Sequence, residues 1–146
     1  TESGEIALKI LVIDAQGGGI GRRLVSAIKQ ELPDAEITAV GTNVAATSAM
    51  RKAGADQTAT GENAVLVACR KVDVIVGPIG IVIADSMLGE ITPAMAAAVG
   101  QSDAKRVLIP FNHCDNLIVG VPDLTMSTLL QSAVELLRKL AVQEAG

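Results

Sequence analysis

A run of four large apolar residues leads directly into a turn with four glycines, and this pairing limits the fold of the chain more than any other feature. The run is Ile10-Leu11-Val12-Ile13, and residues 14–21 read Asp-Ala-Gln-Gly-Gly-Gly-Ile-Gly. Apolar residues then recur at helical spacing from Leu24 to Leu32. A buried strand, a glycine turn and a helix in this order bring backbone N–H groups and a helix N-terminus together, which suits a bound phosphate. Residues 14–21 are therefore predicted to form a phosphate- or nucleotide-binding loop.

Segments of strand and helix character alternate along the rest of the chain. Strands are expected at residues 7–14, 36–41, 72–76, 106–109 and 117–119, and helices at residues 20–31, 44–53, 64–70, 93–99 and 124–143. Thr92 and Pro93 fit the cap and the first turn of the fourth helix. The alternation predicts βαβ units in a Rossmann-like three-layer α/β/α fold, with a mostly parallel sheet of about five strands. Since the sequence contains no repeat or low-complexity linker, residues 1–146 are expected to form a single domain.

The composition argues against several classes of partner. The chain of 146 residues carries a net charge of −4, and no apolar run reaches the ~18 residues that a membrane span requires. Twelve basic residues without a long basic run, together with one aromatic residue, Phe111, argue against nucleic acid. The N-terminus lacks the pattern of a secretory signal, so a cytoplasmic location is expected. Cys69 and Cys114 lack metal-site spacing, and no metal site is expected.

Polar and glycine-rich segments follow most of the predicted strands. In open α/β sheets, ligands bind outside the carboxyl ends of the strands. The residues expected to contact the ligand are Gly17, Gly18, Gly19, Ile20 and Gly21 in the first loop, Thr42 and Asn43 in the second, Glu62 and Asn63 if their loop folds back, and Gly77 and Gly80 after the third strand. Each has a structural alternative, because glycines also serve tight turns and close packing, and Thr, Asn and Glu also cap helices.

Asp14 and His113 are the candidate catalytic residues. Asp14 ends the first strand beside the glycine loop, where it could act as a base or could brace the loop by accepting backbone N–H groups. His113 follows the strand at residues 106–109 and would titrate near neutral pH, although a lone histidine is more often structural. Asp85 and Glu90 offer further carboxylates.

The glycine loop fits no standard nucleotide-binding fingerprint completely. In the dinucleotide pattern Gly-x-Gly-x-x-Gly the first glycine falls on Gln16, and the strand at residues 36–41 ends without the acid that holds ribose hydroxyls. The short-chain dehydrogenase pattern matches only at residues 19–21, and the chain has no Tyr for that chemistry. The Gly-Lys-Ser/Thr of a P-loop is also missing. The expected ligand is a nucleotide, a dinucleotide or another small phosphorylated metabolite, bound without these standard motifs.

Four segments, at residues 13–21, 41–50, 61–64 and 77–93, carry a set of motifs that includes Gly-Thr-Asn, Gly-Glu-Asn and Gly-Pro-Ile-Gly. As a set they resemble a small bacterial family, common in Clostridia and their relatives, that is known only as a domain of unknown function. The resemblance covers residues 7–122 and implies no activity. Ala15 departs from the glycine expected there in the family.

The segments Gly41-Thr42-Asn43 and Gly77-Pro78-Ile79-Gly80 also resemble the phosphate-binding loops of methylglyoxal synthase, a phosphosugar lyase. The motif that carries the catalytic aspartate of that enzyme does not follow Gly80, so this residue has no counterpart here.

Three functions therefore stay open. The chain could bind a nucleotide or phosphorylated metabolite, or it could be an enzyme acting on phosphorylated sugars through Asp14 or His113. It could also be a non-catalytic homodimer that associates through apolar residues at 81–84, 87–88 and 95–99, unless these segments cross the core of the domain itself. The sequence leaves the identity of the ligand and any reaction undetermined.

Overall fold

The computed structural model describes residues 7–111 and 116–145. Its strands are β1 (Lys9–Asp14), β2 (Glu36–Gly41), β3 (Gln57–Thr60), β4 (Val74–Pro78) and β5 (Lys105–Ile109). Its helices are α1 (Gly19–Glu31), α2 (Val44–Lys52), α3 (Glu62–Ala68), α4 (Pro93–Gln101) and α5 (Met126–Ala145), and a short 3-10 helix, η1 (Ile79–Val82), follows β4. The expected alternation of strands and helices is confirmed, and Thr92 caps α4 with Pro93 in its first turn.

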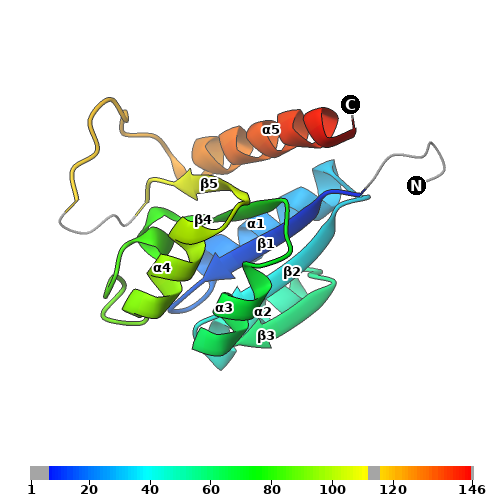
Figure 1. Cartoon of the computed structure of the whole chain (residues 1–146). Coiled ribbons are helices and arrows are strands. Elements are labelled where there is room, and N and C mark those ends of the chain that lie inside the picture. Colours follow the sequence, from blue (N-terminus) through cyan, green and yellow to red (C-terminus); the bar gives the residue numbers. More distant parts are fainter. Residues whose placement is uncertain (1–6, 112–115, 146) are drawn as a thin grey trace.

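The five strands form one sheet in the order β3-β2-β1-β4-β5, and every pair of neighbours is parallel. Helices α1, α2 and α5 cover one face of the sheet, and α3 and α4 cover the other (Figure 1). This is the three-layer α/β arrangement that the sequence predicts. Two of the three inner strands, β1 and β4, are almost continuously apolar, as buried parallel strands require.

The connections that leave β1 and β4 pass to opposite faces of the sheet. The chain runs from β1 into α1 on one face, whereas it runs from β4 through η1 into α4 on the other face. Since β1 and β4 are neighbours, a crevice opens outside their carboxyl ends, and this is where open α/β sheets bind ligands.

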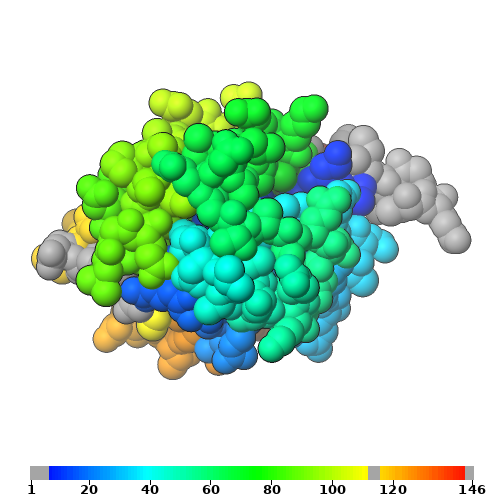
Figure 2. Space-filling model, turned by 90° about the horizontal axis from the view of Figure 1, so that it is seen from below, coloured from blue at the N-terminus to red at the C-terminus, as the bar shows by residue number. Residues whose placement is uncertain are grey.

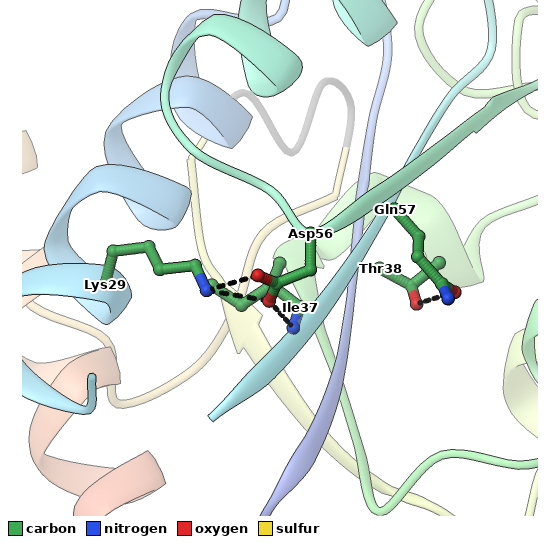
Figure 3. Close-up of polar contacts among 5 residues, drawn as sticks. All are labelled: Lys29, Ile37, Thr38, Asp56 and Gln57. Carbon is green, nitrogen blue, oxygen red and sulfur yellow. Dashed lines mark hydrogen bonds and ion pairs between the residues drawn. The ribbon is translucent and has the colours of Figure 1, made fainter. Parts of the chain in front are cut away.

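Strand β3 was not expected from the sequence. Its residues Gln57-Thr58-Ala59-Thr60 form a mostly exposed edge strand, so they lack the apolar pattern that marks a buried one. Asp56 fixes its start by accepting the backbone N–H of Ile37 and the ammonium of Lys29, at 2.8 and 2.7 Å (Figure 3).

The strand expected at residues 117–119 is wrong. No strand is formed there, and β5 has a partner on one side only among the described residues. Leu117 and Val119 are 91% and 99% exposed. An apolar run of three residues with no neighbouring strand gains no ladder hydrogen bonds, so it has little to hold it extended.

Candidate functional site

The Asp14 carboxylate accepts hydrogen bonds from both ends of the glycine loop. One oxygen accepts the N–H of Ala15 at 2.8 Å, and the other accepts the N–H of Gly21 at 2.6 Å. The residue is only 4% exposed. Asp14 therefore braces the turn between β1 and α1, which is one of the two roles considered from the sequence, and a catalytic role remains a prediction.

The glycines of the loop differ in what surrounds them. A Cβ on Gly18 would lie 2.8 Å from the Ala46 backbone, and one on Gly21 would lie 2.6 Å from the Met50 sulfur. Gly18 also has a φ of +73°, which disfavours other residues. The fold itself therefore requires glycine at these two positions, since they let the loop and α1 pack against α2.

Gly17 and Gly19 have no such explanation within the protein. Neither has a positive φ, and a Cβ at either position would meet nothing within 4 Å. The space that a side chain would occupy is therefore empty at both residues. Close approach of a ligand to the backbone is the other reason for glycine at such a position.

The N–H groups of the loop are only partly used by the protein. The Gly18 and Gly21 N–H groups donate to Ala15 and Asp14, and the Gln16 N–H donates to Glu90. In the part of the chain that the structure describes, the N–H groups of Gly17, Gly19 and Ile20 have no acceptor. These three donors lie at the N-terminus of α1, whose partial positive charge favours an anion.

A pocket of about 170 Å³ opens in front of this loop. Residues 14–20 line it, together with Pro78, Met87 and Phe111. The space-filling view shows the loop at the surface, in blue, beside the start of α2 in cyan and the segment before α4 in yellow-green (Figure 2). The pocket therefore lies at the β1–β4 crevice.

Glu90 links its own segment, before α4, to the loop after β1 and to the loop after β2. One of its carboxylate oxygens accepts the Gln16 N–H at 2.9 Å, the Thr42 hydroxyl at 2.7 Å and the Asn43 amide at 2.8 Å. Glu90 belongs to the β4–α4 segment (residues 83–92), which crosses the carboxyl edge of the sheet to reach the other two loops.

The two carboxylates have pKa values shifted in opposite directions. Burial raises the pKa of Asp14, outweighing the two N–H bonds, and the nearby charge of Glu90 adds to this increase. The hydroxyl of Thr42 holds the pKa of Glu90 below its usual value against a smaller effect of burial, and Gln16 and Asn43 contribute further donors. Glu90 is therefore charged at neutral pH.

The polar residues predicted after β2 and β3 are all near the carboxyl edge, but they are not gathered around one cavity. Thr42 and Asn43 donate to Glu90, and the Asn43 side-chain oxygen caps α2 by accepting the Ala46 N–H. Glu62 accepts the Thr92 hydroxyl at 2.8 Å, and Asn63 is exposed on α3. Ligand contact by these four residues remains a prediction.

Gly77 and Gly80 are surrounded by the protein. A Cβ on Gly77 would lie 2.4 Å from the Ile13 carbonyl oxygen, and one on Gly80 would lie 2.9 Å from the Met87 methyl group. Close packing around β4 and η1 accounts for both glycines, so neither needs a ligand to explain it. His113 and Cys114 lie outside the described residues.

The sequence reasoning did not identify Met87 as a lining residue, nor Glu90 as the residue that joins the loops. Met87 lies in a turn where Asp85, Met87 and Leu88 have φ values between +54° and +64°. Among the residues of this turn, Gly89 favours left-handed backbone strongly and Asp85 weakly, whereas Met87 and Leu88 do not favour it. Nothing in the pattern indicates that Glu90 points back to Gln16.

A larger groove of about 720 Å³ lies over the outer face of α1, between α2 and α5. Long charged side chains line it, including Arg22, Lys52 and Arg138, and Arg138 forms an exposed ion pair with Glu31 at 2.6 Å. The only buried polar side chains among the described residues are Asp14 and Thr47, and neither lines this groove. The glycine-loop pocket is therefore the better candidate.

Two further observations concern the described residues as a whole. None of their helices is both long and apolar enough to cross a membrane. They also contain no group of three or more His, Cys, Asp or Glu side chains placed to hold a metal ion.

Comparison with known proteins identifies the family of this chain. Residues 9–142 match the model of a family described as a domain of unknown function (DUF3842), in agreement with the resemblance seen in the motifs. No curated protein matches the chain. One solved structure that matches is a dodecameric FMN-dependent UbiX-like decarboxylase from Escherichia coli O157:H7, at 18% identity and a TM-score of 0.46. The match covers 91% of this chain and 76% of that chain. A likeness this distant carries no argument about function.

Proposed function

The chain belongs to the DUF3842 family, and we propose that it binds a phosphate-bearing small molecule, a nucleotide or another phosphorylated metabolite, in the glycine-loop pocket. The observation that carries the proposal is the pair Gly17 and Gly19. Both line the pocket, and neither packing nor backbone conformation requires glycine there. A ligand that approaches the backbone supplies the missing reason.

The chemistry of the pocket favours an anion bound by backbone groups. The three N–H groups that have no acceptor among the described residues, at Gly17, Gly19 and Ile20, lie at the N-terminus of α1. No Lys or Arg side chain is among the described residues that line the pocket, so the helix end supplies the positive potential. With about 170 Å³, the pocket accommodates a phosphate group while the rest of the ligand extends outward.

The first test is thermal unfolding with NAD, NADP, ATP, GTP, S-adenosylmethionine and phosphorylated sugars, with and without magnesium. A ligand at ~100-fold its dissociation constant stabilises the protein by roughly 2.7 kcal/mol, which raises the midpoint by several degrees. We expect at least one phosphate-bearing compound to do so. A flat response to every compound would contradict the proposal.

The second test uses a glycine that the structure leaves free to change. Gly19→Ala adds a methyl group that touches no atom of the protein at a residue that lines the pocket, so we expect the fold to be retained and ligand affinity to fall roughly tenfold or more. Gly100→Ala in α4 is the matched control, because its Cβ also meets nothing within 4 Å but it lies outside the pocket. Equal affinity in both variants would contradict the proposed site.

An enzyme acting on phosphorylated sugars remains a second proposal, and the raised pKa of Asp14 is the observation in its favour. Both Asp14 oxygens already accept N–H groups, so acid–base chemistry there would have to share them. Loss of turnover in Asp14→Asn with ligand binding retained would support this reaction class, and turnover that survives the change would exclude Asp14 from it.

Association of two copies also remains a proposal. Ile81, Met95 and Val99, which were expected on the dimer surface, are buried in the protein's own core. Leu88 is 97% exposed and still offers apolar surface near the pocket. Light scattering at low concentration tests the proposal, and the mass of a monomer would contradict it.

A further inference from the structure

The position of Glu90 has a counterpart in nucleotide-binding sheets of this strand order. In such sheets an acid at the end of the second strand accepts the ribose hydroxyls of a nucleotide whose phosphates lie on the glycine loop after the first strand. Here β2 ends at Gly41, followed by Thr42, and neither is acidic. A Cβ at Gly41 would lie 2.6 Å from the Thr47 backbone nitrogen, so β2 has no room for an acidic side chain at its last residue.

Glu90, from the segment before α4, places a carboxylate at the carboxyl end of β2. Its bonds to Thr42 and Asn43 hold it at the carboxyl end of β2, and its bond to the Gln16 N–H holds it against the glycine loop. Gln16 also lines the pocket. The carboxylate therefore lies beside the phosphate pocket, on the side where a ribose would follow.

The hydrogen bonds of Glu90 leave it able to accept more. All three donors bind the same oxygen, Oε1, and within the described residues the other oxygen, Oε2, has no donor. Glu90 as a residue is only partly buried. A carboxylate has about four acceptor positions, and it accepts hydroxyl donors strongly when charged.

The β4–α4 segment is built to present this side chain. The Asp85 N–H donates to the Ile91 carbonyl at 2.7 Å, which closes residues 85–91 into a turn that contains Glu90. The Ser86 hydroxyl anchors the turn to the Gly80 carbonyl at 2.5 Å. The carboxylate is thus placed by backbone contacts on one side and by Thr42 and Asn43 on the other, before any ligand binds.

We infer that Glu90 accepts the ribose hydroxyls of a ribonucleotide whose 5′-phosphates bind the glycine loop. This inference rests on the proposed phosphate site and narrows its ligand to a class. Sugar phosphates that lack the 2′,3′-diol of a ribose, and 2′-deoxynucleotides, are poorer ligands for such a site.

The test compares the four common ribonucleoside 5′-diphosphates with their 2′-deoxy counterparts by calorimetric titration. The wild-type protein is expected to bind at least one ribonucleotide roughly tenfold or more tightly than its deoxy form, the effect of losing one hydrogen bond to a charged group. Glu90→Gln is expected to bring that ratio close to one. Glu36→Gln, which removes a carboxylate at the opposite edge of the sheet, is expected to leave it unchanged.

Inorganic pyrophosphate, which has no ribose, separates the roles that Glu90 can have. If Glu90 accepts ribose, Glu90→Gln lowers the ratio of ribonucleotide to deoxynucleotide affinity and does not weaken pyrophosphate binding, because the loss of a nearby negative charge favours an anion. If the Glu90 carboxylate instead only opposes phosphate binding, the same change tightens pyrophosphate, ribonucleotides and deoxynucleotides alike, and the inference is overturned. A uniform loss for every ligand would show that Glu90 only supports the loop, which also overturns it.

Failure of this inference can be told apart from failure of the proposed function. If ribonucleotides and deoxynucleotides bind equally well, and Gly19→Ala weakens the binding of both, the ribose contact is overturned but the phosphate site is kept. Binding of phosphorylated sugars without any nucleotide has the same meaning. If no nucleotide, sugar phosphate or pyrophosphate binds, both proposals are overturned.

Discussion

The Asp14 carboxylate accepts the N–H of Gly21 across the whole glycine loop, at 2.6 Å. This bond joins the end of β1 to the first turn of α1, and the Asp14 bond to Ala15 joins it to the start of the same loop. The loop is therefore held in one shape before any ligand arrives. Such preorganisation lowers the cost of ordering the loop when a ligand binds.

The first prediction concerns this brace. Asp14→Asn replaces one accepting oxygen with an NH₂ group, which must then face a backbone N–H in a buried place. We expect the free energy of unfolding to fall by about 1–3 kcal/mol, because one buried donor loses its acceptor. Urea unfolding measures the change. Asp34→Asn, at an exposed position, is the control, and a loss for Asp14→Asn that is no greater than for Asp34→Asn would contradict the bracing role.

The second prediction separates the glycines that the fold needs from the others. Gly18→Ala adds a Cβ 2.8 Å from the Ala46 backbone at a φ of +73°, so we expect a loss of roughly 2–4 kcal/mol from overpacking and strain. Gly17→Ala meets nothing, and we expect its stability to stay within about 0.5 kcal/mol of wild type. Denaturant unfolding of both variants checks this, and equal losses would show that the loop packs differently.

Much of the fold was predictable because local patterns decide it. Strand β2 occupies residues 36–41 as expected, and the apolar run that predicts β1 is buried in the centre of the sheet. Helix α4 begins where Thr92 and Pro93 signal its start. In each case the residues that form the element also carry the signal.

Elements that depend on distant partners were not predictable in this way. Strand β3 is polar because it lies at the edge, and it is held by pairing with β2. Glu90 joins the site through partners that are 47 to 74 positions away in sequence. A single sequence shows which residues can donate or accept, but only the packing of the layers shows which of them meet. The glycine-rich turn between β1 and α1 could be predicted, because its residues are adjacent in the sequence.

The third prediction concerns Asp56, which links β3 to β2 and α1. Burial would raise its pKa, but the Ile37 N–H and the ammonium of Lys29 outweigh this and lower it. A lowered pKa means that the charged form stabilises the fold above the ordinary pKa, and that this contribution is lost as pH falls through the folded value. Since the pair is partly exposed, we expect Asp56→Asn to cost no more than about 1 kcal/mol at pH 7.

Urea unfolding of wild type and Asp56→Asn at pH 7 and pH 3 measures this effect. We expect the difference between the two proteins to be smaller at pH 3, which lies below the ordinary pKa of an aspartate, so that the contribution of the charged form is already being lost there. A difference that stays constant between the two pH values would show that the charge of Asp56 does not contribute.

The last prediction concerns the hydroxyl that sets the ionisation of Glu90. Thr42 donates to Glu90 at 2.7 Å, and this bond is the main reason why the pKa of Glu90 lies below its usual value. Thr42→Val keeps the shape of the side chain and removes the donor, so we expect the pKa of Glu90 to rise. Thr38→Val, on β2, is the matched control, because the Thr38 hydroxyl donates to Gln57 and does not contact Glu90. NMR titration of the Glu90 carboxyl carbon measures the pKa directly. An unchanged titration in Thr42→Val would mean that Thr42 does not hold Glu90 at the end of β2, and the placement of a ribose acceptor there would lose one of its three supports.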